Sequence, residues 1–370
     1  MCEAPDVSRG GVRRSPSPGI LSDARVLLAR IVIAIVLSAT AAAAQNIGAV
    51  PHPVTNNAVA AGRIGQAWWI FSALGVDSTK RWSGITRRAH GWNSETKEWF
   101  ALADVPGADG RLAATAQVVR GRLYLIGGYT VDSAGGEKSL ASVDVYTAST
   151  GKWSAGAAIP IPVDDAVSGV YRDSLIYLVS GWHDTDNVQD VQVYDVVRDR
   201  WTAATPTPGR GVFGHTGELA GRTIVYVDGA AKQLSGAPYA LVPQVWLGRI
   251  DPSQPTRIDW QRGPAHPGPA LYRAAAAACG RSVVIAGGTA SPYNYNGIGY
   301  DTRPSEPLSS IISFDTDRGT WRSLAPLPVA TMDHRALARR GHTGWIVGGM
   351  RAGQRVSADI VTITPLPCEP

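Results

Sequence analysis

Two stretches, LYLIGGYT at residues 123–130 and SVDVYTASTGKW at residues 142–153, indicate the architecture, because variants of this pair recur along the chain. Each copy has an apolar strand that ends in a glycine turn, a loop of variable length, a second strand around an aromatic residue, and a closing Trp. Two further copies are IYLVSGWH (176–183) with VQVYDVVRDRW (191–201), and VVIAGGTA (283–290) with IISFDTDRGTW (311–321). Such internal periodicity predicts a repeat architecture.

The closing Trp residues and the glycine turns count the repeats. The Trp markers are Trp99, Trp153, Trp201, Trp260 and Trp321. The glycine turns lie at residues 74–75, 127–128, 180–181, 229, 287–288 and 348–349, which gives six units. A strand rich in Ala, Gly and Ser precedes each turn, as expected where inner strands crowd around a central axis. We therefore predict an all-β fold, a six-bladed β-propeller.

The two ends of the repeat array indicate how the ring closes. The last unit stops after its third strand, SADIVTITP (357–365), and has no closing Trp. A spare strand at residues 45–50 precedes the first unit. Because closure removes exposed sheet edges, we expect the N-terminal strand to complete the last blade. The propeller domain is then residues 45–370.

Residues 1–44 read as an N-terminal leader with a signal peptide. Basic Arg25 and Arg30 precede the apolar run Ile31–Leu37, and small residues follow up to Ala44. This pattern predicts export, with cleavage before Gln45. An uncleaved membrane anchor is the alternative, but the uninterrupted apolar run is shorter than the roughly 20 residues that a spanning helix needs.

Charge and cysteine content limit the partners. The net charge of +5 comes without a basic run, so nucleic acid is not an expected partner. Cys2 lies in the leader, which leaves Cys279 and Cys368. In an oxidising compartment these two could pair; otherwise Cys279 is a buried thiol and Cys368 a loose one. No metal-binding motif is present, and we expect no metal and no cofactor.

The glycine doublets, the Tyr194-Asp195 pair and the spaced Trp residues resemble kelch repeats from Gln45 to Thr364. The chain is most similar to exported bacterial kelch propellers, which include the sialic acid mutarotases (N-acetylneuraminate epimerases), and it also resembles the propeller of the galactose oxidases. The resemblance implies a periplasmic or secreted protein that binds a sugar or sugar acid at the axial mouth, with mutarotase- or epimerase-like isomerisation as the implied chemistry.

The chain departs from both enzyme patterns. Copper-dependent galactose oxidase chemistry needs a Tyr joined to a Cys, and neither Cys279 nor Cys368 falls where an axial site is expected. The mutarotases are thought to use a Glu and an Arg on the loop after the fourth blade's second strand. The matching stretch VYVDGAAKQLSG (225–236) has Ala230 in place of that Glu, with Asp228 and Lys232 nearby.

The loops at the axial mouth supply the candidate site residues. Acid–base candidates are Asp165, His183, Asp333 and His334. Candidate substrate-binding residues are Arg111, Tyr129, Trp182, Arg210, Arg273, Tyr293, Asn294, Tyr295, Arg335 and Arg351. An Arg fork suits carboxylates and aromatic rings suit sugar faces. Alternatively, an Arg at the beginning of an inner strand hydrogen-bonds between blades.

The insert at residues 289–307 is Tyr-rich and long enough to cover the mouth. A deep pocket lined by Arg111, Arg273, Asp333 and Tyr295 would favour a small carbohydrate ligand. A flat mouth would favour the alternative, a non-catalytic kelch scaffold that binds a protein or a cell-envelope partner, because propellers serve both purposes.

Overall fold

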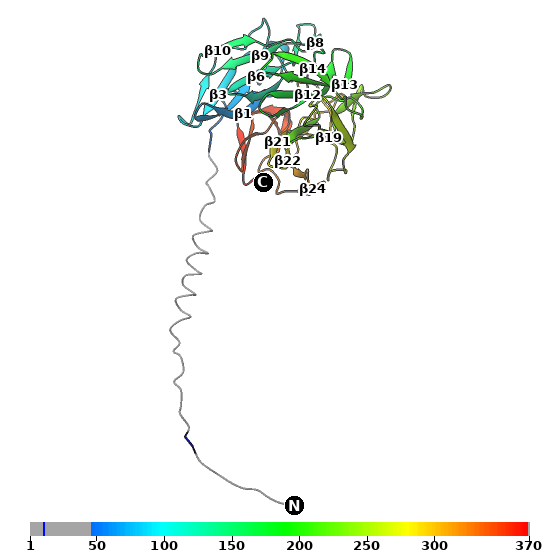
Figure 1. Ribbon diagram of the computed structural model, residues 1–370. Coiled ribbons are helices and arrows are strands. Elements are labelled where there is room, and N and C mark those ends of the chain that lie inside the picture. Colours follow the sequence, from blue (N-terminus) through cyan, green and yellow to red (C-terminus); the bar gives the residue numbers. More distant parts are fainter. Residues whose placement is uncertain (1–9, 12–45, 369–370) are drawn as a thin grey trace, which may run out of the picture. The chain divides into compact units, whose positions relative to one another are not determined.

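The computed structural model describes residues 10–11 and 46–368, and the chain divides into two compact units at Gln45. The leader predicted for residues 1–44 therefore lies outside the described residues except for Gly10 and Gly11. Residues 46–368 form strands and turns with two short 3-10 segments, Trp82–Gly84 and Ala352–Gln354, and contain no α-helix (Figure 1). Nowhere in the described part is there a helix long and apolar enough to cross a membrane. The predicted all-β fold is confirmed.

Six antiparallel sheets form the blades. In Figure 1 the last blade (red) lies beside the first (blue). Blades 1 to 3, inner strand first, are β1 (Ala58–Ile64), β2 (Ala67–Ala73), β3 (Ala89–Asn93) and β4 (Glu98–Ala101); β5 (Thr115–Val119), β6 (Arg122–Ile126), β9 (Val143–Thr147) and β10 (Lys152–Ala155); β11 (Val167–Tyr171), β12 (Leu175–His183), β13 (Asp186–Asp195) and β14 (Arg200–Ala204). Blades 4 to 6 are β15 (Thr216–Ala220), β16 (Thr223–Val227), β19 (Val245–Ile250) and β20 (Ile258–Arg262); β21 (Ala275–Cys279), β22 (Ser282–Ala286), β23 (Ile311–Asp315) and β24 (Thr320–Ser323); β25 (Ala338–Arg340), β26 (Thr343–Val347) and β29 (Ile360–Ile363). Three blades add a hairpin after their second strand, namely β7 (Tyr129–Val131) with β8 (Glu137–Ser139), β17 (Ala230–Lys232) with β18 (Tyr239–Leu241), and β27 (Met350–Arg351) with β28 (Arg355–Val356).

The second residue of every glycine turn joins its blade to the next one. Its N–H donates to a carbonyl at the start of the following blade, in the pairs Gly75–Arg111, Gly128–Val163, Gly181–Val212, Gly229–Leu271, Gly288–Thr331 and Gly349–Val54. A Cβ on Gly75 would lie 2.4 Å from the carbonyl oxygen of Thr55, and its φ is +95°. Only glycine fits so close an approach at this φ, which explains why the repeat requires it.

The closing Trp residues join blades at the outer side of the ring. Each indole N–H donates to the carbonyl of a residue just before its own blade, in the pairs Trp99–Ile47, Trp153–Ala103, Trp201–Ala157, Trp260–Thr205 and Trp321–Pro264. The ring of Trp153 also packs on Tyr146, with centroids 5.0 Å apart. Tyr146 in turn lies 6.4 Å from Phe71 of blade 1, centroid to centroid, so aromatic side chains also fill space between neighbouring blades.

The N-terminal segment closes the ring, although not as a regular strand within the described residues. Ile47 and Val50 are each 3% exposed and pack between blades 6 and 1. The Val50 N–H donates to the Ala358 carbonyl at 2.9 Å. The Ile47 carbonyl accepts the Trp99 indole N–H, just as the Ala103 carbonyl, which follows β4, accepts the Trp153 indole N–H. The N-terminal segment thus closes the ring between blades 6 and 1 as expected, but the described residues Asn46–Val50 make these contacts without forming a strand.

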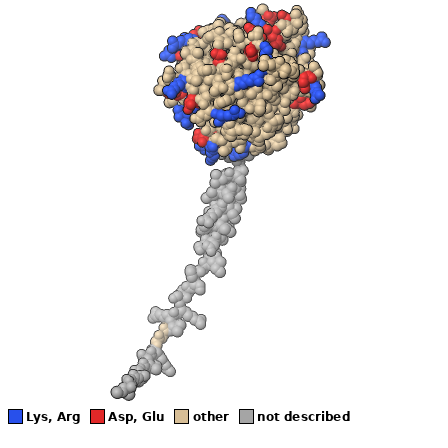
Figure 2. Space-filling model, turned by 90° about the vertical axis from the view of Figure 1, so that its right-hand side faces the viewer, with Lys and Arg blue, Asp and Glu red and all other residues tan. Residues whose placement is uncertain are grey.

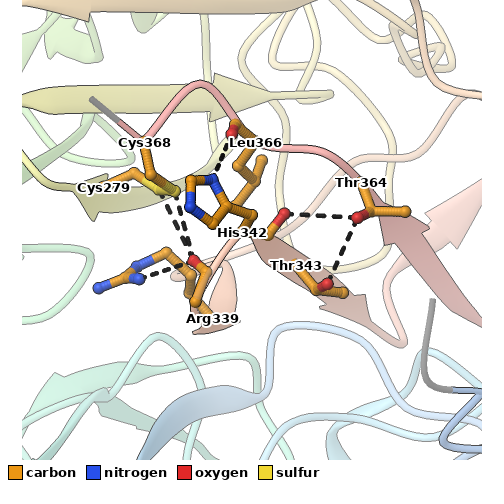
Figure 3. The surroundings of a disulfide bond; sticks show 8 residues. Cys279, Arg339, His342, Thr343, Thr364, Leu366 and Cys368 are labelled. Carbon is orange, nitrogen blue, oxygen red and sulfur yellow. Dashed lines mark hydrogen bonds between the residues drawn. A yellow bond between two sulfur atoms is a disulfide. The ribbon is translucent and has the colours of Figure 1, made fainter. Parts of the chain in front are cut away.

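Cys279 and Cys368 form a disulfide, so the pairing left open by the sequence occurs. Their Cα atoms are 4.6 Å apart and their sequence separation is 89 residues. Cys279 ends β21 of blade 5, and Cys368 follows β29 of blade 6. Figure 3 shows Arg339, the middle residue of β25, beside this bond. The disulfide therefore ties the C-terminal segment to the inner strand of the preceding blade.

Candidate functional site

Six residues with left-handed backbone form a ring around the axis, one at the beginning of each inner strand. They are Asn56, Ala113, Asp165, Gly214, Arg273 and Asp333, with φ between +49° and +72°. Neighbours in the ring are linked by N–H to carbonyl bonds, as from Asp165 to Ala113 and from Gly214 to Asp165. Such conformations are costly for residues other than glycine, so the inter-blade bonds must maintain them.

Side chains complete this ring where the last blade meets the first. The Thr55 hydroxyl donates to Asp333 at 2.6 Å, and the Asn56 amide donates to the same carboxylate at 3.3 Å. The Asn56 oxygen in turn accepts the Ala113 N–H and an N–H of Arg335. Asn56 therefore replaces with its side chain the backbone link that the other blades make.

An ion network fills the centre of the ring. Arg273 pairs with Asp165 through two nitrogens and with Asp333 at 3.2 Å. Arg335 pairs with Asp165 at 2.7 Å. Arg273, Asp165 and Asp333 are at most 2% exposed, so no ligand reaches them unless other side chains move. We call this set of four residues the axial plug, and it brings together four of the candidates predicted from sequence.

The charges of the plug shift the pKa values of two adjacent aspartates. Burial opposes ionisation of Asp165, but Arg273 and Arg335 outweigh it and hold its pKa below the usual range. Burial and the neighbouring Asp165 charge raise the pKa of Asp164 well above its ordinary value. The Asp164 carboxyl accepts the Ser139 hydroxyl at 2.6 Å. The pKa values of these two adjacent carboxyls thus shift in opposite directions, because Asp165 pairs directly with two guanidinium groups.

The two candidate histidines lie apart from one another. His334 is 4% exposed, and its Nε2 lies 2.8 Å from the Thr331 hydroxyl. Burial, with the nearby charges of Arg351 and Arg335, lowers the pKa of His334 well below its usual value. His183 ends β12 and contacts the Pro162 carbonyl through Nδ1 at 2.7 Å. His334 is therefore a neutral buried residue, and only His183 of the two is partly accessible.

The other predicted arginines separate into three environments. Arg111 is buried and pairs with Asp144 of its own blade at 2.6 Å. Arg210 is exposed and donates to the Lys232 carbonyl. Arg351 is buried, yet its guanidinium makes no hydrogen bond to any described residue and lies 3.8 Å from Asp359. The expected pocket lined by Arg111, Arg273 and Asp333 is therefore not formed, because these side chains are buried in internal pairs.

Aromatic side chains from blades 3, 4 and 5 cover the plug. The Tyr239 ring lies 5.4 Å from Trp182, 5.2 Å from Phe213 and 4.4 Å from Tyr300, centroid to centroid. Tyr293 is fully buried, and its ring lies over the Arg273 guanidinium at 5.3 Å. The insert at residues 289–307 thus seals part of the mouth with Tyr293 and Tyr300. Asn294 is used inside this insert, where its side chain accepts the Tyr295 N–H.

Glu137 on β8 is a mouth residue that the sequence did not single out. It is exposed, yet the loops around it withdraw enough water that burial raises its pKa, with Arg273 opposing. Burial is the largest cause that raises the pKa of Tyr129, Tyr239 and Tyr295, and the charge of Glu137 is the second. One carboxylate therefore stands among tyrosines above the plug. It lies in the hairpin inserted after the second glycine turn, and only its place in such a loop could have marked it.

The altered loop of blade 4 has a structural explanation. Asp228 takes the position of a turn glycine, and its carboxylate accepts the N–H groups of Gln244 and Leu271. It also contacts Nε2 of His266 at 2.7 Å, and this contact raises the pKa of His266 although burial opposes the shift. Asp228 therefore joins blades 4 and 5. Lys232 is exposed and donates to the Thr185 carbonyl.

The outer surface carries no charge pattern of one sign on the face that Figure 2 shows, where Lys, Arg, Asp and Glu are interspersed. Among residues 46–368, no three His, Cys, Asp or Glu side chains come together as a metal site. A groove of about 570 Å³ lies between the loops of blades 1 and 2. Its lining includes Trp82, which is 47% exposed, together with Arg87, Asp104 and Asp132.

These features define a class of protein: a six-bladed β-propeller whose axis is closed at the mouth by an ion network and an aromatic cover. The kelch motif family model matches residues 110–158 and 270–328. The chain therefore contains kelch motifs and folds as a six-bladed β-propeller.

Comparisons with known proteins agree with this fold. The solved structure of YjhT superimposes with a TM-score of 0.69 at 18% identity, covering 86% of this chain and 97% of that one. The Kelch-like protein terF of Aspergillus terreus is 28% identical over 39% of this chain and 32% of its own length. The human Kelch-like protein 34 is 30% identical over 44% of this chain and 21% of its own length. The chain thus spans a third or less of these two curated relatives.

Proposed function

We propose that this propeller binds a carbohydrate at the mouth, above the axial plug. The observation that carries the proposal is Glu137 among Tyr129, Tyr239, Tyr295 and Tyr300. A carboxylate accepts hydrogen bonds from sugar hydroxyls, and tyrosine rings offer apolar faces with a hydroxyl at the edge. Binding sites for small molecules commonly combine such aromatic walls with a few polar groups.

The charges favour a neutral sugar over a sugar acid. The predicted arginine clamp is occupied, since Arg273 and Arg335 are paired inside the plug. Glu137 is a charged side chain that remains exposed among the mouth tyrosines, and it repels a carboxylate. Its raised pKa also suits proton transfer, so Glu137 is our candidate acid–base group for an isomerisation of the sugar ring.

Ligand-observed NMR tests this proposal with galactose, glucose and N-acetylneuraminic acid as probes. We expect saturation transfer to a neutral sugar, and we expect E137Q or Y300F to weaken binding by about tenfold. E98Q, which removes an exposed carboxylate from the outer strand β4, is the matched control. Binding of neither neutral sugar, or equal binding by E137Q and the unsubstituted protein, would overturn the proposal. Anomer exchange on any bound sugar then tests the isomerisation.

The groove between blades 1 and 2 favours the second candidate function, a scaffold for a protein or cell-envelope partner. Exposed Trp82 is a side chain of the kind that anchors protein interfaces, and acidic and basic groups surround it. We expect W82A to abolish partner capture from envelope extracts while sugar binding is unchanged. Loss of sugar binding in W82A would instead assign the groove to the carbohydrate.

We also propose that the protein is exported to the periplasm or secreted. The disulfide between Cys279 and Cys368 supports this, because such bonds persist in oxidising compartments. N-terminal sequencing of protein from the periplasmic fraction or medium tests the proposal, with Gln45 as the expected first residue. Recovery of the protein only from the cytosol would contradict it.

A further inference from the structure

The propeller axis holds a cavity on the side of the plug that faces away from the mouth. It has a volume of about 240 Å³ and is lined by residues of all six inner strands. These residues lie further along the same strands than the ring residues, so the plug separates the cavity from the mouth. Most of the lining is small or apolar, as at Ala60, Ala116 and Ala277. We call this space the axial channel.

A carboxyl group and a guanidinium group face this channel without forming an ion pair. Glu218 lies on β15 of blade 4 and Arg339 on β25 of blade 6, and both are only partly exposed. No described residue forms an ion pair with either side chain. Glu218 accepts the N–H of the adjacent Leu219 at 2.9 Å, and Arg339 donates one N–H to the Gly341 carbonyl at 2.9 Å. Most of the hydrogen-bonding capacity of both groups is therefore left for the channel.

The surroundings make this separation costly. Burial raises the pKa of Glu218 to about 8, and burial lowers the pKa of Arg339 although the Glu218 charge opposes that shift. Buried charges are normally paired. A molecule that brought a cation to Glu218 and an anion to Arg339 would satisfy both.

The fold holds the two side chains in place. A Cβ on Gly169 of blade 3 would lie 2.8 Å from Oε1 of Glu218 and 2.4 Å from the Leu219 Cβ, so glycine makes room for this carboxylate. The Arg339 bond to Gly341 lies beside the disulfide, as Figure 3 shows, and both cysteine sulfurs also contact that carbonyl. The disulfide thereby fixes the rim of the channel next to Arg339.

We propose that the axial channel binds a small zwitterion of the α-amino acid class, whose ammonium group contacts Glu218 and whose carboxylate contacts Arg339. The small apolar lining leaves room for a short side chain. Gln117, whose amide donates to Ser168 at 3.0 Å, offers a further polar atom in the wall. This site is independent of the carbohydrate site proposed for the mouth.

Titration calorimetry on the full chain tests the proposal with L-alanine and L-serine as probes. Acetate and ethylamine, each with one of the two charges, are the matched ligands and require no substitution. We expect an amino acid to bind at least about tenfold more tightly than acetate or ethylamine. Equal binding of either single-charge probe, or no binding of either amino acid, would overturn the proposal.

Substitutions provide the second arm. We expect E218Q and R339Q each to weaken L-alanine binding by at least about tenfold. The controls are R340Q, which removes an exposed charge from the neighbouring position on β25, and E98Q on β4. Thermal melting establishes that each variant is folded. Unchanged affinity in folded E218Q and R339Q would also overturn the proposal.

Discussion

The two ends of the propeller axis are built from the same six inner strands, yet ionisable side chains are paired at one end and unpaired at the other. At the mouth, Arg273 and Arg335 meet Asp165 and Asp333 in direct pairs, and the space between them is closed. In the axial channel, Glu218 and Arg339 are held apart across an open volume. The comparison teaches that burial alone does not mark a binding site. A site is indicated where charges are buried and left unmatched.

The largest effect is expected from breaking the plug. D165N removes one partner from two buried guanidinium groups, which should lower the free energy of unfolding by about 3–5 kcal/mol. Urea unfolding followed by tryptophan fluorescence measures this change. The control D317N disrupts an exposed pair with Arg281 and should cost no more than about 0.5 kcal/mol. If D165N cost no more than D317N, the plug would not stabilise the fold.

A second effect concerns the channel end. Replacement of both cysteines by serine removes a cross-link between residues 89 apart, and we expect a loss of about 2–4 kcal/mol. The disulfide lies at the channel rim, so L-alanine binding should weaken while any sugar binding at the mouth persists. Chemical denaturation and calorimetry measure the two effects. Equal loss at both sites would mean that the two ends of the axis are not independent.

A third prediction uses the pKa of Glu218, which is raised from 4.5 to about 8 by burial. Between these values the folded state binds the extra proton, so this group makes stability fall as pH rises from about 4.5 to 8. E218Q should remove that fall. The difference in free energy of unfolding between E218Q and the unsubstituted protein should therefore be about 1–3 kcal/mol more favourable to E218Q at pH 9 than at pH 5. Melting curves across this range measure it. A parallel pH profile for E218Q and the unsubstituted protein would refute the assignment.

The smallest effect belongs to His215, which follows the plug ring on blade 4 and is 6% exposed. Burial lowers its pKa from 6.5 to about 4. Here the unfolded state binds the extra proton, so stability falls as pH decreases from about 6.5 to 4. H215N should reduce this loss by about 1–2 kcal/mol. Stability measured at pH 4.5 and 7 tests it, and an unchanged difference between the two pH values would contradict it.

The candidate site was only partly accessible to sequence reasoning. The loop positions of Arg273, Asp165, Asp333 and Arg335 were recognised, because the repeat places every strand beginning at one end of the axis. Their pairing was not, since partners such as Asp165 and Arg273 are 108 residues apart and meet only when the ring closes. Glu137 was missed because its hairpin is an insertion that only some of the repeats contain. Glu218 was missed inside a strand of small residues.

The six blades, their glycine turns and their closing Trp residues can all be predicted from the amino-acid sequence. These features follow from local requirements, a left-handed turn and an aromatic group at fixed spacing, that recur in each unit. The tertiary structure decided the disulfide, the link made by Asn46–Val50, and which buried charges are matched. Those outcomes depend on distances between residues of different blades, which exist only after all six blades have packed around one axis.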